Sequence, residues 1–245
     1  MSKGITSIVF SLLVVAGACF GYADDIHLQF SLSIDNGRAG IVPDVFFAGG
    51  STDVNIAYDI KDLLHPPSPP GKHVRIYTSD TGVDLIRDYR PYDPNLPDLF
   101  FPIQLFAYDT NDIGLTGTSR LNLMNPSVLA AIPIDTLVYL RRYDQHGAFV
   151  EYHNLRNPDN HSVEWEAAEA KDIFARLELV VIDKCLAADI DGSGKVGLKD
   201  FAQIARYWLL YVPTSKRDVD GDRFVGLDDL AIFAEKWLCD CYAKK

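Results

Sequence analysis

Acidic side chains recur at a fixed spacing near the C-terminus of this 245-residue chain. The segment DIDGSGKVGLKDFAQIARYW (residues 189–208) is matched without a gap by DVDGDRFVGLDDLAIFAEKW (residues 218–237). Ca²⁺ takes about six to eight oxygen ligands, and a twelve-residue loop supplies them from positions 1, 3, 5, 7, 9 and 12. The first twelve residues of each copy have this spacing. The sequence therefore predicts two calcium-binding loops.

The predicted ligands occupy equivalent positions in the two loops. In the first loop they are Asp189, Asp191, Ser193, the Lys195 carbonyl, Gly197 through a water molecule, and Asp200. In the second loop they are Asp218, Asp220, Asp222, the Phe224 carbonyl, Gly226 and Asp229. Gly194 stands at position 6, where the turn needs a positive φ, whereas Arg223 takes that place in the second loop. Acidic, glycine-rich loops are often solvated turns, but two loops in one register favour metal binding.

An amphipathic helix is expected after each loop. Apolar residues fall at i, i+3, i+4 and i+7 in both copies: Phe201, Ile204, Ala205 and Trp208, then Leu230, Phe233, Ala234 and Trp237. No helix is expected before either loop. Val196 and Val225, at loop position 8, are expected to pair the two loops back to back.

Together these features resemble the dockerin type I module, over residues 185–241. The resemblance implies calcium-dependent folding and docking onto a cohesin module of a scaffold or cell surface. It places the partner contacts at loop positions 10 and 11, often Ser-Thr in the family, which are Leu198 and Lys199 in one copy and Leu227 and Asp228 in the other. This departure makes a partner other than the usual cohesin an open alternative. A leucine at position 10 is also compatible with packing between loop and helix.

Three of the four cysteines flank the repeat: Cys185, Cys239 and Cys241. In an exported chain they predict a disulfide from Cys185 to either Cys239 or Cys241, which leaves one thiol over. A module of roughly 60 residues has a small core and commonly needs metals or disulfides.

Residues 1–23 have the features of a signal peptide. Lys3 supplies positive charge, and residues 5–15 are apolar but too short to span a bilayer. Small residues allow cleavage after Ala18 or Ala23, whereas residues 16–19 resemble a lipobox with Cys19 as the lipid-bearing residue. We expect export to the extracellular space or cell surface, with free secretion and a lipid anchor both open, and no membrane span. The excess of 34 acidic over 23 basic residues excludes nucleic acid as a favourable partner.

Residues 24–182 are expected to form a separate antiparallel β-sandwich or jelly roll. Strands are predicted at residues 26–32, 53–60, 74–78, 99–108, 137–143, 149–153 and 177–182, and a short helix at 163–172. Arg141, Arg142, Tyr143 and Tyr152 offer either a sugar-binding patch or ordinary packing on a strand face.

No catalytic constellation is evident in this segment. Its six histidines form no metal-binding pattern, and the chain has no G-x-S-x-G motif. A glycosidase needs two carboxylates across a cleft, which sequence alone does not reveal. We therefore expect a non-catalytic binding or structural module carried into a polysaccharide-degrading or cell-surface assembly. The alternative is a small jelly-roll hydrolase that acts on the glycosidic bonds of a polysaccharide.

Overall fold

A computed structural model describes residues 26–35, 44–51, 63–64, 72–78, 84–91, 93, 97–108, 115–170, 172–212 and 216–243. The predicted signal peptide with Cys19, and the strand predicted at residues 53–60, lie outside these described residues. None of the described helices has the length and apolar character that a membrane-spanning helix needs.

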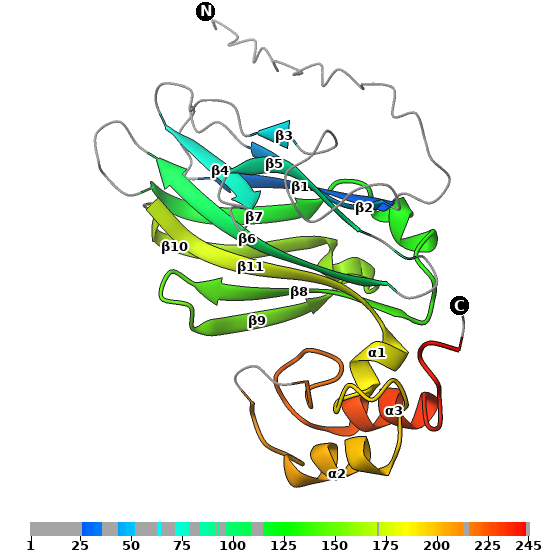
Figure 1. Ribbon diagram of the computed structural model, residues 1–245. Coiled ribbons are helices and arrows are strands. Elements are labelled where there is room, and N and C mark those ends of the chain that lie inside the picture. The colour runs from blue at the N-terminus through cyan, green and yellow to red at the C-terminus, as the bar shows by residue number, and fades with distance from the viewer. Residues whose placement is uncertain are drawn as a thin grey trace, which may run out of the picture.

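The described chain is mainly β-structure followed by three short α-helices (Figure 1). The strands are β1 (Ile26–Asp35), β2 (Asp44–Ser51), β3 (Leu63–Leu64), β4 (His73–Thr78), β5 (Leu85–Pro91), β6 (Asp98–Tyr108), β7 (Leu115–Leu123), β8 (Thr136–Asp144), β9 (Phe149–Asn154), β10 (Ser162–Ala170) and β11 (Asp172–Asp183). Two 3-10 turns, η1 (Pro126–Ala130) and η2 (Pro158–His161), lie between strands. The helices are α1 (Lys184–Ala188), α2 (Leu198–Arg206) and α3 (Leu227–Glu235).

The strands are hydrogen-bonded in the order β10-β7-β1-β2-β5-β4-β6-β11-β8-β9, and β3 pairs with β5. Neighbours run antiparallel except β2 and β5, which are parallel. The path curls into a sandwich-like arrangement in which the β10 half faces the β8 half (Figure 1). Across this interior the Arg142 guanidinium of β8 lies 4.6 Å from the centre of the Trp165 ring of β10.

One hydrophobic core fills the interior of this β region. Along β1, alternate residues are buried from Ile26 to Ile34, because successive side chains of a strand point to opposite faces. They share one cluster with residues of β6 and β11, such as Phe101 and Leu179. The predicted strands within the described residues are confirmed as β1, β4, β6, β8, β9 and β11.

The helix predicted at residues 163–172 is wrong, because residues 162–170 form strand β10. Val163 is buried and Trp165 packs against the core, whereas Glu164 and Glu166 are exposed. Glu164 pairs with Arg120 and Glu166 accepts a hydrogen bond from Thr118, both on the neighbouring strand β7. The pattern has the period of two that a strand requires, and pairing with β7 outweighs the helix preference of Glu and Ala.

Strands β2, β3, β5 and β7, and helix α1, are further differences from the prediction. In β2 a pair of glycines resembles a turn, but Gly49 lies against the ring of Tyr89, which would be 2.6 Å from an added Cβ. Helix α1 precedes the first loop, where no helix was expected. It begins because the carboxylate of Asp183 accepts a hydrogen bond from the main-chain N–H of Cys185 at 2.7 Å.

A disulfide joins Cys185 to Cys241 across a sequence separation of 56 residues, and Cys239 is a half-buried free thiol. The two alternatives left by the sequence are thus decided in favour of Cys241. Cys185 and Cys241 are both buried in a second hydrophobic cluster, which also contains Ile204 of α2 and Phe233 of α3. The small repeat is held together by this cluster and by the disulfide.

We expect Cys241→Ala to lower the free energy of unfolding of the repeat by roughly 4 kcal/mol, the chain-entropy value for a closed loop of this length. Urea denaturation of the oxidised full chain, followed through tryptophan fluorescence, measures the loss. The matched control is Cys239→Ala, which removes the free thiol and should change the free energy by less than about 1 kcal/mol. Equal losses in the two variants would contradict the pairing.

Candidate calcium-binding repeat

The first loop gathers three carboxylates. Oxygen atoms of Asp189, Asp191 and Asp200 lie within 4.8 Å of one another. Asp200 is buried at the start of α2, where its Oδ1 accepts a hydrogen bond from the Asp191 N–H at 2.9 Å and its Oδ2 from the Gly197 N–H at 2.8 Å. Asp189 accepts from the N–H groups of Ser193 and Gly194. These main-chain hydrogen bonds fold the loop around its own acids.

The second loop has the same framework of main-chain hydrogen bonds, but a different set of loop positions supplies the converging carboxylates. Oxygen atoms of Asp218, Asp220 and Asp222 lie within 4.8 Å of one another, and Asp229 is not part of that group. Asp229 is nevertheless buried, accepting hydrogen bonds at Oδ1 from the Val219 and Asp220 N–H groups and at Oδ2 from the Gly226 N–H. Position 12 therefore ties the loop to its helix in both copies.

The remaining predicted ligands are main-chain or hydroxyl oxygens. Ser193 Oγ donates to the Lys195 carbonyl at 3.1 Å, which places these two oxygens together. The Phe224 N–H donates to the Asp222 carboxylate at 2.7 Å, in the equivalent part of the second loop. Oxygen atoms of this kind are the ligands that Ca²⁺ prefers, so the donor set fits the ion.

Position 6 has a positive φ in both loops, +83° at Gly194 and +72° at Arg223. Arginine is strained there, since side chains disfavour this region. The Arg223 side chain has contacts that offset the strain, because its guanidinium lies 4.5 Å from the centre of the Phe149 ring of β9. The replacement of the turn glycine thus attaches the second loop to the β region.

Burial makes ionised carboxylates costly in the second loop. It raises the pKa of Asp220 to about 8, and the neighbouring Asp229 carboxylate adds to the shift. Burial likewise raises the pKa of Asp229 to about 6, in opposition to main-chain hydrogen bonds that lower it. Several buried acids at one site favour either protons or a cation. A divalent cation satisfies this requirement.

Without metal, the free energy of unfolding should fall as the pH rises from about 4 to about 8. Folded Asp220 retains its proton up to about pH 8, whereas the unfolded chain loses it near pH 4, so the unfolded state binds fewer protons in this range. We expect the free energy of unfolding to decrease by about 2 to 3 kcal/mol over this range. This is less than the full pKa shift would give, because partial solvent access screens the charge. Urea denaturation of metal-free protein across this range measures it.

The isosteric variant Asp220→Asn is the control for this pH dependence. It should remove most of the slope, because the amide does not titrate. In saturating calcium the wild-type slope should reverse, since Ca²⁺ binds ionised carboxylates. A slope that is unchanged in Asp220→Asn would assign the dependence to other groups.

The loops do not pair back to back through Val196 and Val225. The Val196 N–H donates to the Cys239 carbonyl after α3, and the Val225 N–H donates to the Leu210 carbonyl after α2, each at 3.0 Å. Each loop therefore pairs with the segment that follows the other loop's helix. This reciprocal pairing is equivalent in the two copies and gives the repeat an approximate two-fold symmetry. Both valines are buried in the same cluster.

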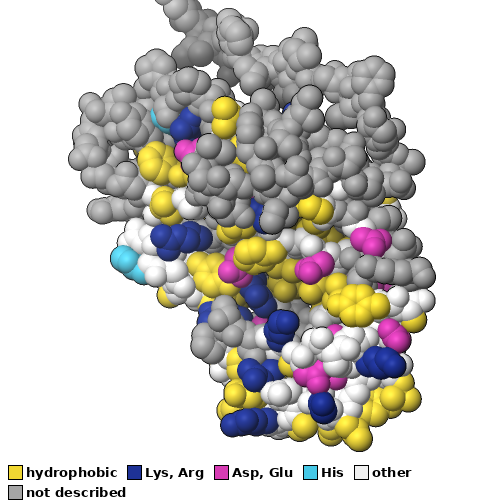
Figure 2. All heavy atoms as spheres, viewed as in Figure 1, with side chains coloured by type: hydrophobic (Ala, Val, Ile, Leu, Met, Phe, Trp, Pro, Cys, Tyr) yellow, Lys and Arg dark blue, Asp and Glu magenta, His cyan; other side chains and the backbone are white. Residues whose placement is uncertain are grey.

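An apolar groove runs between α2 and α3. It is lined by Leu198, Phe201, Leu230, Phe233, Ala234 and Trp237. Apolar side chains also gather at the lower edge of the molecule, where Figure 1 places α2 (Figure 2). Leu198 and Leu227 are 74% and 73% exposed, and Lys199 and Asp228 are exposed beside them. Such exposure disfavours the alternative that these leucines pack between loop and helix.

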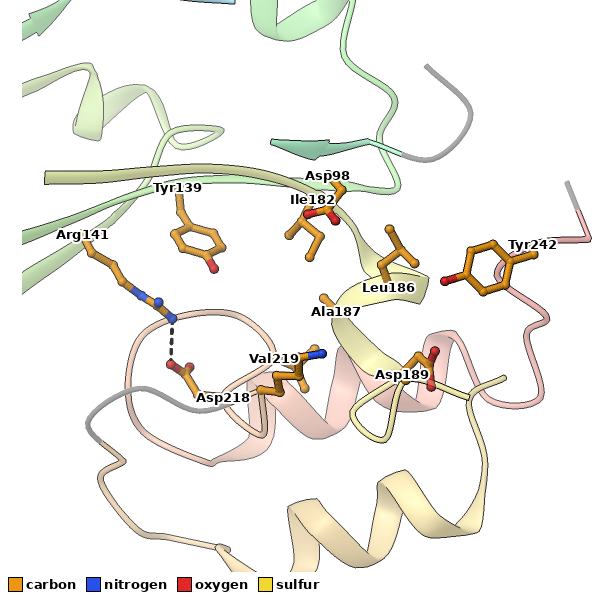
Figure 3. A pocket seen from close by; sticks show the side chains of 12 residues that line it. Asp98, Tyr139, Arg141, Ile182, Leu186, Ala187, Asp189, Asp218, Val219 and Tyr242 are labelled. Carbon is orange, nitrogen blue, oxygen red and sulfur yellow. Dashed lines mark hydrogen bonds and ion pairs between the residues drawn. The ribbon is translucent and has the colours of Figure 1, made fainter. Parts of the chain in front are cut away.

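The second loop lies against strand β8, an arrangement that the sequence does not predict (Figure 3). Arg141 Nη2 lies 2.9 Å from Asp218 Oδ2, and Arg141 Nε donates to the Gly221 carbonyl at 2.6 Å. Arg141, Arg142 and Tyr143 are all buried, so they do not form an exposed sugar-binding platform. An isolated arginine in a strand carries no sequence signal that points to a loop 77 residues away.

Gly221 should tolerate alanine far less well than Gly192, the residue at the same position of the first loop. Both have positive φ, but a Cβ on Gly221 would lie 2.6 Å from the buried Tyr139 ring, whereas nothing lies within 4 Å of one on Gly192. We expect losses of about 1 kcal/mol for Gly192→Ala from backbone strain and about 2 to 4 kcal/mol for Gly221→Ala. Urea denaturation in chelator compares them, and equal losses would contradict the close contact with Tyr139.

Comparison of the chain with protein-family models, with curated proteins and with solved structures found no match.

Proposed function

We propose that the C-terminal repeat binds two Ca²⁺ ions and docks the chain, in a calcium-dependent manner, onto a cohesin-type protein module. The observation that carries this proposal is the matched pair of loops. In each, carboxylates converge, position 6 has a positive φ, and a buried position 12 acid accepts hydrogen bonds from the same loop. Asp189, Asp191, Ser193, Asp200 and the Lys195 carbonyl would hold one ion, and Asp218, Asp220, Asp222, Asp229 and the Phe224 carbonyl the other.

The groove between α2 and α3 supports the docking part of the proposal. Its lining is apolar, and the two leucines at the helix starts, Leu198 and Leu227, are largely exposed. Exposed contiguous apolar surface on a small module is typical of protein interaction sites. The resemblance to dockerin type I places the partner contacts at these same helix starts.

The β region is proposed to be a non-catalytic binding or structural module, exported with the repeat and carried into a polysaccharide-degrading or cell-surface assembly. Burial of Arg141, Arg142 and Tyr143 favours a packing role for the β8–β9 hairpin over sugar stacking. The hydrolase alternative rests on the sandwich-like arrangement alone, and a fold by itself does not determine a function.

Calorimetric titration of the metal-free full chain with CaCl₂ tests the metal sites, for which we expect two ions per chain. Surface plasmon resonance against immobilised type I cohesin modules, in calcium and in chelator, tests docking. Absence of calcium uptake would overturn the whole proposal. Calcium uptake without binding to any cohesin module would overturn only the docking part.

A further inference from the structure

Arg141 of strand β8 is placed within the second calcium loop. Its guanidinium makes two contacts there, to the Asp218 carboxylate and to the Gly221 carbonyl. The Arg141 side chain is 11% exposed and that of Asp218 is fully buried, so the ion pair is largely shielded from water. Arg141 Nη1 also lies 3.6 Å from Glu178 Oε2 on the neighbouring strand β11, which helps to orient the guanidinium.

No described residue plays the part of Arg141 at the first loop. Asp189, which corresponds to Asp218, accepts hydrogen bonds from the Ser193 and Gly194 N–H groups, and within the described residues no cation is paired with it. The second loop also has one more ligand acid than the first, four against three. One positive charge from β8 offsets that additional negative charge.

Asp218 is loop position 1, so the same carboxylate would serve both Arg141 and a calcium ion. Its second oxygen accepts a hydrogen bond from the Gly221 N–H, so a calcium ion at Asp218 would share the two carboxylate oxygens with both donors and would lie close to the Arg141 charge. Two cations that share one buried carboxylate repel each other at close range, and low solvent access strengthens the repulsion.

We propose that Arg141 is a counter-charge supplied by β8 to the second loop, so that calcium binding in that loop and attachment of the loop to β8 oppose each other. The inference rests on the calcium binding proposed above. By linkage the opposition is reciprocal: if Arg141 weakens calcium binding, calcium weakens the Arg141 contacts by the same factor. Calcium then loosens the second loop from the β region while the first loop is unaffected.

The test isolates the second loop in the full chain by adding Asp191→Ala, which removes a ligand from the first loop. Calorimetric titration with CaCl₂ should show that Arg141→Met binds calcium about tenfold more tightly than the same background with Arg141, the effect of one close charge. Arg141→Lys keeps the positive charge and should bind within about threefold of the background.

Arg142→Met is the matched control. Arg142 is the next residue on β8 and its side chain is equally buried, but it contacts Glu151 and Trp165 and not the repeat. It should leave the calcium affinity unchanged. Arg141→Met that binds calcium no more tightly than the background would overturn the inference while the calcium site stands. The proposed function predicts two bound ions in the wild type. Absence of calcium uptake by both the wild type and the background protein would reject the proposed function instead.

A measurement on the unaltered protein removes dependence on how the variants fold. The Arg141 Nε–H is buried and donates to Gly221, so its signal in nitrogen-15 NMR should exchange slowly with solvent in chelator. Saturating CaCl₂ should accelerate that exchange at least about tenfold. Equal or slower exchange with calcium would show that Arg141 and calcium do not oppose each other.

Discussion

The double variant Asp200→Ala, Asp229→Ala should fail to take up calcium and should lose about 5 kcal/mol of calcium-dependent stabilisation. Each ion contributes about 2.7 kcal/mol at a hundredfold excess over its dissociation constant, and the two sites add. Both acids are buried at position 12, and each fixes its loop through main-chain hydrogen bonds. Loss of the carboxylate removes a ligand and this framework together. Urea denaturation of wild type and variant, each with and without calcium, gives the difference.

Asp228→Ala is the control for the double variant. Asp228 precedes Asp229 on α3 and carries the same charge, but it is exposed, whereas Asp229 is buried and accepts main-chain hydrogen bonds from its loop. It should retain both ions and lose less than about 0.5 kcal/mol. In chelator the double variant should lose only the helix-start hydrogen bonds, about 1 kcal/mol for each helix. Undiminished calcium uptake by the double variant would move the sites away from these loops.

The loops were predictable because their chemistry is local. The spacing of the acids, the turn at position 6 and the apolar stripes of the helices all lie within about one loop and one helix, so the sequence pattern predicts them, while calcium binding itself stays a prediction. The strands that were predicted correctly, such as β1, alternate cleanly between core and surface. Strand β10 was missed because Glu and Ala favour a helix locally, and only its pairing with β7 selects the strand.

Contacts between distant segments were not predictable from the sequence. Val196 and Val225 each pair with the segment that follows the other loop's helix, which depends on how the two copies pack. Direct pairing of the two loops would bury the valines as well, so their apolar character does not distinguish the two arrangements. The contacts of Arg141 with Asp218 and Gly221 depend on where β11 ends, because α1 follows that strand directly and delivers the repeat to the β8 surface. Such placement is a property of the assembled fold and leaves no periodic signal in either segment.

Leu198→Asp combined with Leu227→Asp should weaken docking by about 2 kcal/mol or more, at least roughly thirtyfold, because the partner then finds no apolar anchor at either helix start. Either single substitution should weaken docking far less. The repeat has approximate two-fold symmetry, so a rotated module presents an almost equivalent helix start to the partner. The measurement is surface plasmon resonance against the cohesin module that binds the wild type, in saturating calcium.

Leu64→Asp is the control for the docking variants, since it makes the same chemical change at a half-exposed leucine of β3, far from the repeat (Figure 1). It should leave docking unchanged. Calcium uptake is measured in parallel, because a docking loss counts only when both ions still bind. A double variant that binds calcium normally and docks at wild-type strength would place the interface further along the helices. Arg206, Tyr207 and Glu235 would then be the residues to substitute, as all three remain at least partly exposed near the helix ends.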